Sequence, residues 1–128
     1  MRNYFNNIKF KNIKNFRFQY VFCKENEWKD YFDLLIENGV NVLKHFDIKY
    51  RIVNVTDRDT GYHIKKYDIE VLTKTYGWME THSCTYFGLE QSKRYNIKGS
   101  NHTLSCTGIA TPRVLIPIIE RITNQMVK

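Results

Sequence analysis

Four strand-like segments follow one another between residues 48 and 107, and the connections between them constrain the fold most. The segments are IKYRIVNVT (48–56), YDIEVLT (67–73), WMETHSCTY (78–86) and NHTLSCT (101–107). Each is rich in β-branched or aromatic residues, as strands are. The loops between them are short, whereas parallel strands need crossover connections of a dozen residues or more. We therefore expect a mostly antiparallel sheet.

Helical patterns flank these strands. A further strand-like segment, FRFQYVFC (16–23), precedes a stretch at 26–46 in which apolar residues recur at helical spacing. A short irregular or helical piece covers 88–96, and an apolar C-terminal helix runs to about Asn124. Gly39 lies inside the first helical pattern and is expected to weaken it. The order predicts an α+β fold, a mostly antiparallel sheet flanked by helices.

Length and composition favour one domain with an anionic partner. The chain has 128 residues, and its net charge of +7 fits a polyanion without identifying one. Residues 1–15 read as a polar lead-in without the apolar core of a secretory signal, and no apolar run is long enough to cross a membrane. The three cysteines have no CxxC spacing, and their odd number argues against a disulfide framework. A cytoplasmic location is the simplest expectation.

A zinc site is one candidate for the chemistry. His82 and Cys84 lie two residues apart on one predicted strand, and His102 and Cys106 lie four apart on another, so each pair shares a face. If those faces coincided, the four side chains could bind zinc tetrahedrally. Buried cysteines are more often small apolar core residues, which favours a structural explanation.

A second candidate pairs Glu80 with Arg113. Positive charge is mildly unfavourable at a helix N-terminus, so Arg113 makes sense there if an anion lies in front of it. Strict alternation predicts that Glu80 and His82 face one way and that Thr81 and Ser83 face the other. On the residues alone, a solvent-facing glutamate and a surface arginine are the favoured explanation.

Three segments, taken in order, resemble a known family. YRIVNVTDRDTGYHIKKYDIEVL, METHSCTYFGLEQSKR and HTLSCTGIATPRVLIPIIE are similar to successive segments of bacterial-type seryl-tRNA synthetase, a class II aminoacyl-tRNA synthetase. The resemblance covers roughly residues 16–120 and includes the arginine of class II motif 3. It implies that residues 16–128 form a partial class II catalytic domain, from the second strand of motif 2 through motif 3.

The resemblance assigns roles to particular side chains. Arg113 would contact the ATP triphosphate, and Glu80 and Ser83 would bind ATP together with Mg²⁺. These residues would serve attack of the serine carboxylate on the α-phosphorus, with Arg113 and Glu80 as the catalytic pair. Thr107 and Ser105 fall in the serine pocket.

Further matches within the resemblance indicate scaffold. Asp59 and Gly61 match a family turn in which Arg58 replaces a glycine, and residues 67–70 match a family strand.

The sequence also departs from the family pattern. Tyr20 stands where the family has a lysine, and Phe22 stands where it has the glutamate that helps hold serine. The α-phosphate arginine of motif 2 has only Arg17 as a candidate, and motif 1 and the tRNA-binding helical arm are expected to be absent. Pro117 interrupts a helix that is continuous in the family, so that helix is expected to start later here.

Two functional interpretations remain open. In the first, the chain is a reduced or partial serine–tRNA ligase that uses ATP, Mg²⁺, serine and tRNA(Ser), as a homodimer or with a complementing chain. In the second, it is a catalytically inactive class II-like module that binds a nucleotide or RNA. The zinc-binding structural domain is the third.

Overall fold

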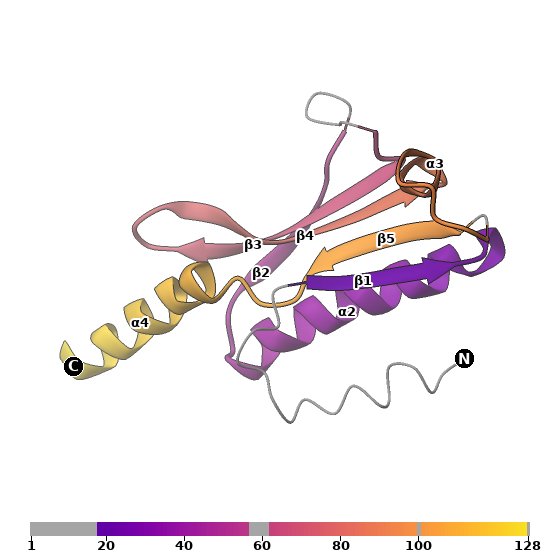
Figure 1. Cartoon of the computed structure of the whole chain (residues 1–128). Coiled ribbons are helices and arrows are strands. Elements are labelled where there is room, and N and C mark those ends of the chain that lie inside the picture. Colours follow the sequence, from indigo (N-terminus) through magenta and orange to yellow (C-terminus); the bar gives the residue numbers. More distant parts are fainter. Residues whose placement is uncertain (1–17, 57–61, 100, 128) are drawn as a thin grey trace.

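The described residues form one five-stranded antiparallel sheet, with one long helix along the sheet and the C-terminal helix extending outward from its end (Figure 1). The computed structural model describes residues 18–56, 62–99 and 101–127, and in 125–127 only the backbone. The strands are β1 (Phe18–Cys23), β2 (Tyr50–Asn54), β3 (Lys65–Thr73), β4 (Gly77–Gly88) and β5 (His102–Thr107), arranged in the order β1-β5-β4-β3-β2. The helices are η2 (Glu25–Glu27), α2 (Trp28–His45), α3 (Glu90–Arg94) and α4 (Thr111–Val127). The predicted α+β fold class is confirmed.

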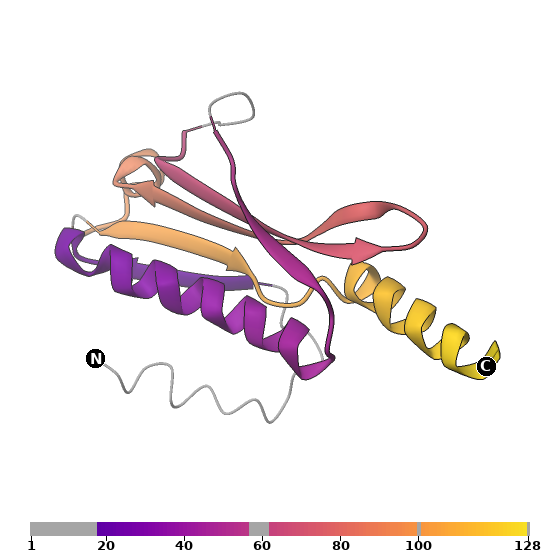
Figure 2. The same cartoon turned by 180° about the vertical axis from the view of Figure 1, so that it is seen from behind.

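Helix α2 covers one face of the sheet and makes most of the core (Figure 2). Its buried residues recur at three- and four-residue intervals, so they form one stripe along the helix. The stripe comprises Phe32, Leu35, Gly39, Val40 and Leu43. Against it pack alternate residues of the strands, among them Val21, Leu104 and Tyr86. Val114 of α4 lies in a second buried cluster, together with Ile69 and Val71 of β3 and with Val40 and Leu43 of α2.

Gly39 is explained by close packing of α2 on the sheet. A Cβ atom at this position would lie 3.0 Å from Cδ2 of His82 and 3.1 Å from Cδ1 of Ile69. Both neighbours are fully buried, so neither has room to move away. The glycine lowers intrinsic helix propensity but allows the backbone of α2 to approach the sheet more closely than any other residue would.

The face of the sheet opposite α2, here called the open face, carries the other half of the strand residues. Paired residues of antiparallel strands point to the same side, so the register assigns the faces. Phe18, Tyr20 and Phe22 of β1 pair with Thr107, Ser105 and Thr103 of β5. The odd-numbered residues of β1 are buried and the even-numbered ones are exposed, which identifies this set as the open face.

Helix α4 begins at Thr111, so its first turn precedes Pro117. The amide of Val114 donates to the carbonyl of Ala110 at 3.0 Å, so the helix is already formed in the turn that holds Arg113. Pro117 lies inside the helix and is buried, without delaying its start. The expectation of a later start was wrong, because the lost hydrogen bond to the carbonyl of Arg113 is offset by burial of the proline ring.

The cysteines also correct the sequence analysis. Cys84 and Cys106 are directly paired across β4 and β5, with their Cα atoms 3.9 Å apart, and they form a disulfide. Cys23 remains a free, buried thiol. An odd number of cysteines does not prevent one bonded pair, and the pairing depends on the register of two strands, which cysteine spacing does not reveal.

Candidate functional site

A β-bulge at Thr81 determines which side chains of β4 reach the open face. The register pairs Ile69 with His82 and then Glu70 with Glu80, so Thr81 is an extra residue on β4. Its side chain is buried and donates to the carbonyl of Ile69 or to Nδ1 of His82. The side chain of Glu80 therefore lies on the opposite face of the sheet from that of His82. The prediction from strict alternation was wrong at this point.

The bulge brings the predicted side chains of β4 together with those of β5. Ser83 precedes the Cys84–Cys106 pair in the register, and its amide donates to Oγ1 of Thr107 at 3.2 Å. Ser105 pairs with Tyr20 on one side and with Thr85 on the other. Glu80, Ser83, Ser105 and Thr107 thus share the open face, each partly exposed.

Arg113 approaches the same surface from the first turn of α4. Its Nη1 donates to the carbonyl oxygen of Glu80 at 3.0 Å and lies 3.8 Å from Oε1 of that residue. Both side chains remain accessible, with 54% of Arg113 and 40% of Glu80 exposed. The guanidinium and the carboxylate therefore face one shared region, in which further donors of the arginine are available to an anion.

The region around Glu80 is rich in carboxylates. Asp68 pairs with Ser83 and Glu70 pairs with Glu80 across β3 and β4. Oδ1 of Asp68 is buried without a hydrogen-bond partner, although Nζ of Lys66 lies 3.8 Å away. Partial burial raises the pKa of Glu80, and the charges of Asp68 and Glu70 raise it further against the opposing effect of Lys66 and Arg113. The resemblance assigned Asp68 to scaffold, and the bulge that moves Glu80 to the face of Asp68 has no sequence signal.

This electrostatic setting predicts a pH dependence of stability. A carboxyl group whose pKa is raised on folding stabilises the folded chain below its unfolded pKa, and that contribution is lost as pH rises through the folded pKa. As pH rises from acidic to neutral, the free energy of unfolding of Glu80→Gln should therefore increase relative to that of the unsubstituted chain. Urea unfolding at a series of pH values measures this difference.

Glu120 supplies a control of opposite sign. Hydrogen bonds from the amides of Lys74 and Thr75 lower the pKa of its carboxyl group. Its contribution to stability is present above the unfolded pKa and is lost as pH falls through the folded pKa, so Glu120→Gln should lose stability relative to the unsubstituted chain as pH rises. If Glu80→Gln behaves in the same way as Glu120→Gln, the ion pair with Arg113 outweighs burial and carboxylate repulsion at Glu80.

The four predicted zinc ligands are otherwise engaged. Burial lowers the pKa of His82, and its neutral ring lies between the hydroxyl of Thr81 at 2.8 Å and the carbonyl of Gly108 at 3.0 Å. His102 contacts the hydroxyl of Tyr86 at 2.6 Å, and the two cysteines are bonded to each other. Within the described ranges no cluster of three or more histidine, cysteine or acidic side chains could hold a metal ion. The zinc hypothesis is therefore not supported.

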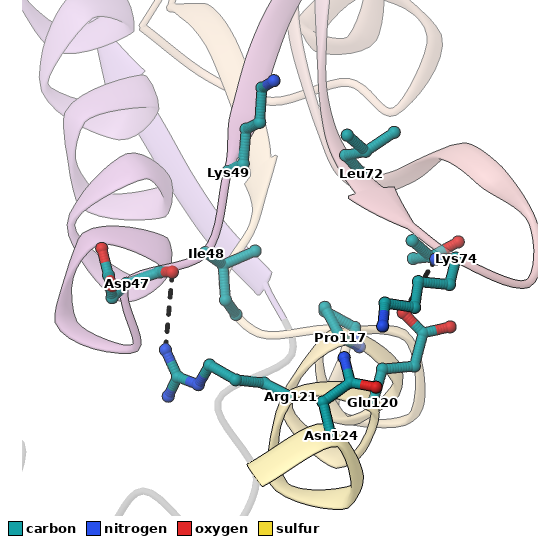
Figure 3. Close-up of a pocket in the computed structure, with 10 residues that line it drawn as sticks. Asp47, Ile48, Lys49, Leu72, Lys74, Pro117, Glu120, Arg121 and Asn124 are labelled. Atoms are coloured by element: carbon teal, nitrogen blue, oxygen red, sulfur yellow. Dashed lines mark hydrogen bonds between the residues drawn. The ribbon is translucent and has the colours of Figure 1, made fainter. Parts of the chain in front are cut away.

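A cavity of about 480 Å³ lies away from these residues, under α4 (Figure 3). Its lining includes Pro117 and Leu72, and two charged side chains of α4 tie the helix to the loops on either side. Glu120 accepts from the amide of Lys74, and Arg121 donates to the carbonyl oxygens of Phe46 and Asp47. Because both charged side chains already form hydrogen bonds with backbone groups, we interpret the cavity as a packing gap between α4 and the sheet.

Some sequence predictions fall outside the described residues. The polar lead-in 1–15, Arg17, and the turn residues Arg58, Asp59 and Gly61 are among them, so the structure does not test their assignments. Of the described helices, none combines the length and apolarity needed to span a membrane.

The fold and the open face together define the class of protein. A five-stranded antiparallel sheet carries α2 on one face, and Arg113 of α4 contacts Glu80 of β4. This arrangement has the architecture of a partial class II aminoacyl-tRNA synthetase core. Within that class, the chain is a partial homologue of the seryl-tRNA synthetases.

Two curated relatives carry the sequence evidence. The serine–tRNA ligase of Deinococcus radiodurans is 33% identical over 114 residues, which span 80% of this chain and 27% of that protein. The serine–tRNA ligase of Picrophilus torridus is 38% identical over 111 residues, which span 80% of this chain and 25% of that protein. The chain thus spans about a quarter of the length of the relatives it matches. No protein-family model matches it.

Two solved structures share the fold. Seryl-tRNA synthetase from Pyrococcus horikoshii complexed with ATP has a TM-score of 0.74 at 29% identity, covering 80% of this chain and 26% of that one. Cytoplasmic serine–tRNA ligase from Naegleria fowleri in complex with AMP has a TM-score of 0.74 at 28% identity, covering 80% and 24% of the two chains.

Proposed function

We propose that this chain is a reduced or partial serine–tRNA ligase, which activates serine with ATP and passes the seryl group to tRNA(Ser). The observation that carries the proposal is the meeting of Arg113 with Glu80, beside Ser83 and Thr107, on one face of the sheet. As protein partners we propose a second copy of the chain or a complementing chain. This activity belongs in the cytoplasm, where tRNA is charged.

The site residues fit a nucleotide with its metal. Glu80, Asp68 and Ser83 offer oxygen atoms, which are the ligands that Mg²⁺ prefers. Burial and the charges of Asp68 and Glu70 raise the pKa of Glu80, and a bound cation would oppose both effects. Arg113 supplies donors for phosphate oxygens. When bound, Mg²⁺ would neutralise part of the triphosphate charge. In the resemblance, Glu80 and Ser83 are the metal-binding pair.

The chain's own contribution to the reaction is alignment and charge neutralisation. Attack of the serine carboxylate on the α-phosphorus, with pyrophosphate as the leaving group, requires no covalent intermediate with the protein. Arg113 would hold the triphosphate end of ATP, while Glu80 would hold the other end of the same magnesium–nucleotide. Thr107 and Ser105 would contact serine through their hydroxyl groups, and the backbone N–H of Ser83 donates a hydrogen bond to the hydroxyl oxygen of Thr107.

A second candidate function is supported by the β1 side of the open face. In the resemblance, Tyr20 and Phe22 stand where the family has a lysine and the glutamate that helps hold serine, and the register pairs Tyr20 with Ser105. Loss of a polar partner for the substrate reduces discrimination by orders of magnitude. In this alternative, the chain binds a nucleotide or RNA without activating serine.

Serine-dependent exchange of labelled pyrophosphate into ATP separates the two candidates. We expect exchange by the chain, alone or with its complementing part, and loss of exchange in Glu80→Gln. Glu90→Gln is the matched control, because 40% of each glutamate side chain is exposed and Glu90 pairs with Arg94 on α3. Absence of exchange together with measurable ATP binding would establish the second candidate instead.

A further inference from the structure

We infer that the outward face of α4 is a contact surface for a second copy of this chain, with the two α4 helices packed antiparallel. The surface, here called the outer stripe, consists of Leu115, Ile119 and Ile122. It shares no residue with the lining of the cavity or with the proposed ATP site. The inference gives a surface to the second copy named above as a partner, and it stands whether or not the chain activates serine.

The outer stripe is a row of apolar side chains turned to solvent. Leu115, Ile119 and Ile122 are 44%, 56% and 48% exposed. Their spacing of four and then three residues places them on one side of a helix with 3.6 residues per turn. Single exposed apolar side chains are common on any protein surface, whereas a continuous row along two turns of one helix indicates an interaction surface.

The charged side chains of α4 contact the body of the molecule instead. Arg113 donates to the carbonyl oxygen of Glu80. Glu120 accepts from two backbone amides in the turn between β3 and β4, and Arg121 donates to two carbonyl oxygens just after α2 (Figure 3). Among the described side chains of α4, these three are all the charged ones. Their contacts fix the rotation of α4 about its own axis, so the outer stripe faces outward before any partner binds.

A second copy fits the outer stripe because this face of α4 carries no charge. Each copy has a net charge of +7, so most pairs of surfaces from two copies repel each other. The exposed side chains of α4 beside the stripe, Pro112 and Thr123, are uncharged as well. Contact through the outer stripe therefore buries apolar surface without bringing like charges together.

The outer stripe also matches itself under a two-fold axis. In an antiparallel pair centred on Ile119, this residue lies opposite its counterpart, and Leu115 lies opposite Ile122 of the second copy. Such a contact is isologous and closes at two copies. Both views show α4 extending outward from the end of the sheet (Figures 1 and 2), so antiparallel pairing places the two positively charged bodies at opposite ends of the helix pair. Parallel pairing would place them side by side.

Other occupants fit the outer stripe less well. A helix that lies on a membrane surface exposes Lys and Arg on the face opposite its apolar one, whereas the charged side chains of α4 are engaged by the body. RNA would require cations beside the stripe for its phosphates. A different apolar protein would leave the chain monomeric when it is alone in solution, which is an outcome of the test below.

Sedimentation velocity of the full chain over a concentration series tests the dimer directly. Helix α4 has 17 residues and is about 25 Å long, and a pair of such helices buries less than a standard interface of about 1,600 Å². We therefore expect a weak dimer, with a dissociation constant on the order of 10–100 µM. At the lower concentrations of an unfolding measurement the chain is monomeric, so the outer stripe does not contribute to the free energy of unfolding measured there.

One pair of matched variants tests the surface. Ile119→Lys should abolish dimerisation over the concentration series, because both copies lose apolar burial and gain a charge that faces its counterpart. Ile52→Lys is the control, because Ile52 is 47% exposed on β2, and it should leave the dissociation constant unchanged. Circular dichroism checks that both variants are folded.

Cysteine cross-linking tests the antiparallel register. Ile119→Cys should form a disulfide between two copies under oxidation by dissolved oxygen, because the two sulfur atoms meet at the two-fold axis. The native cysteines do not compete, since Cys23 is buried and Cys84 and Cys106 are bonded to each other. Ile52→Cys is the control and should cross-link far more slowly.

Three results would overturn the inference. They are a chain that stays monomeric at every concentration, a dimer that persists in Ile119→Lys, and equal cross-linking of Ile119→Cys and Ile52→Cys. Pyrophosphate exchange is recorded separately. Dimerisation without exchange would contradict only the proposed ligase function, and exchange by a monomer would contradict only the inference about α4.

Discussion

Replacement of Arg113 by alanine is expected to reduce serine-dependent pyrophosphate exchange about 10²- to 10³-fold, with a parallel loss of ATP affinity. The magnitude is that of losing one preorganised donor to developing negative charge. The fold should persist, because the side chain is 54% exposed and its contacts with Glu80 form a surface pair worth at most about 1 kcal/mol. Exchange kinetics and ATP titration measure the two effects.

Arg51→Ala is the control for this prediction. Arg51 is similarly exposed, at 48%, and lies on the same face, where its Nε contacts Oε2 of Glu70 at 2.5 Å. Its guanidinium also stacks 4.4 Å above the ring of Trp78. We expect nearly unchanged exchange in this variant. Equal losses in both variants would mean that only the general positive charge of the surface matters and that Arg113 has no specific role.

Replacement of Leu104 by alanine is expected to lower the free energy of unfolding by about 2–5 kcal/mol. Leu104 is fully buried near the middle of β5, and its register partners Val21 and Tyr86 are buried beside it. Truncation removes apolar contacts and leaves a cavity that the two neighbouring strands cannot close, because both are fixed by the sheet. Domains of this size have only about 5–15 kcal/mol in total, so the loss is a large fraction of the stability of the fold.

Leu115→Ala provides the comparison for the core. Leu115 lies on α4 with 44% of its surface exposed, and alanine is the best helix former, so we expect a change within about 0.5 kcal/mol. Urea unfolding followed by circular dichroism measures both variants under one condition. If Leu104→Ala costs no more than Leu115→Ala, the α2 side of the sheet is not the main core.

Local sequence patterns were sufficient to predict the elements of the fold. The alternating pattern of residues 18–23 and the helical spacing of residues 28–45 place one face of each element in the core, since burial of apolar side chains dominates the choice of face. Short connections between strands predict antiparallel pairing, which the whole sheet shows. The resemblance to synthetases also rests on residues, and the relatives confirm it.

The geometry of the candidate site was decided by pairing between strands. A single extra residue, Thr81, moves Glu80 to the face of Ser83 and Asp68, and nothing in the sequence of β4 distinguishes this bulge from regular alternation. The disulfide between Cys84 and Cys106 likewise depends on register, because it joins residues 22 positions apart. The glycine at position 39 is explained only by the close packing of α2 against His82.

The sequence by itself determined which elements form and which apolar face most of them bury, because the hydrophobic effect acts on periodicities of 2 and 3.6 residues that are visible in one dimension. Only the tertiary structure decided which polar groups meet. Arg113 reaches Glu80 because α4 packs on β3 and β4, and a distance between residues 33 positions apart follows from packing, not from spacing along the chain.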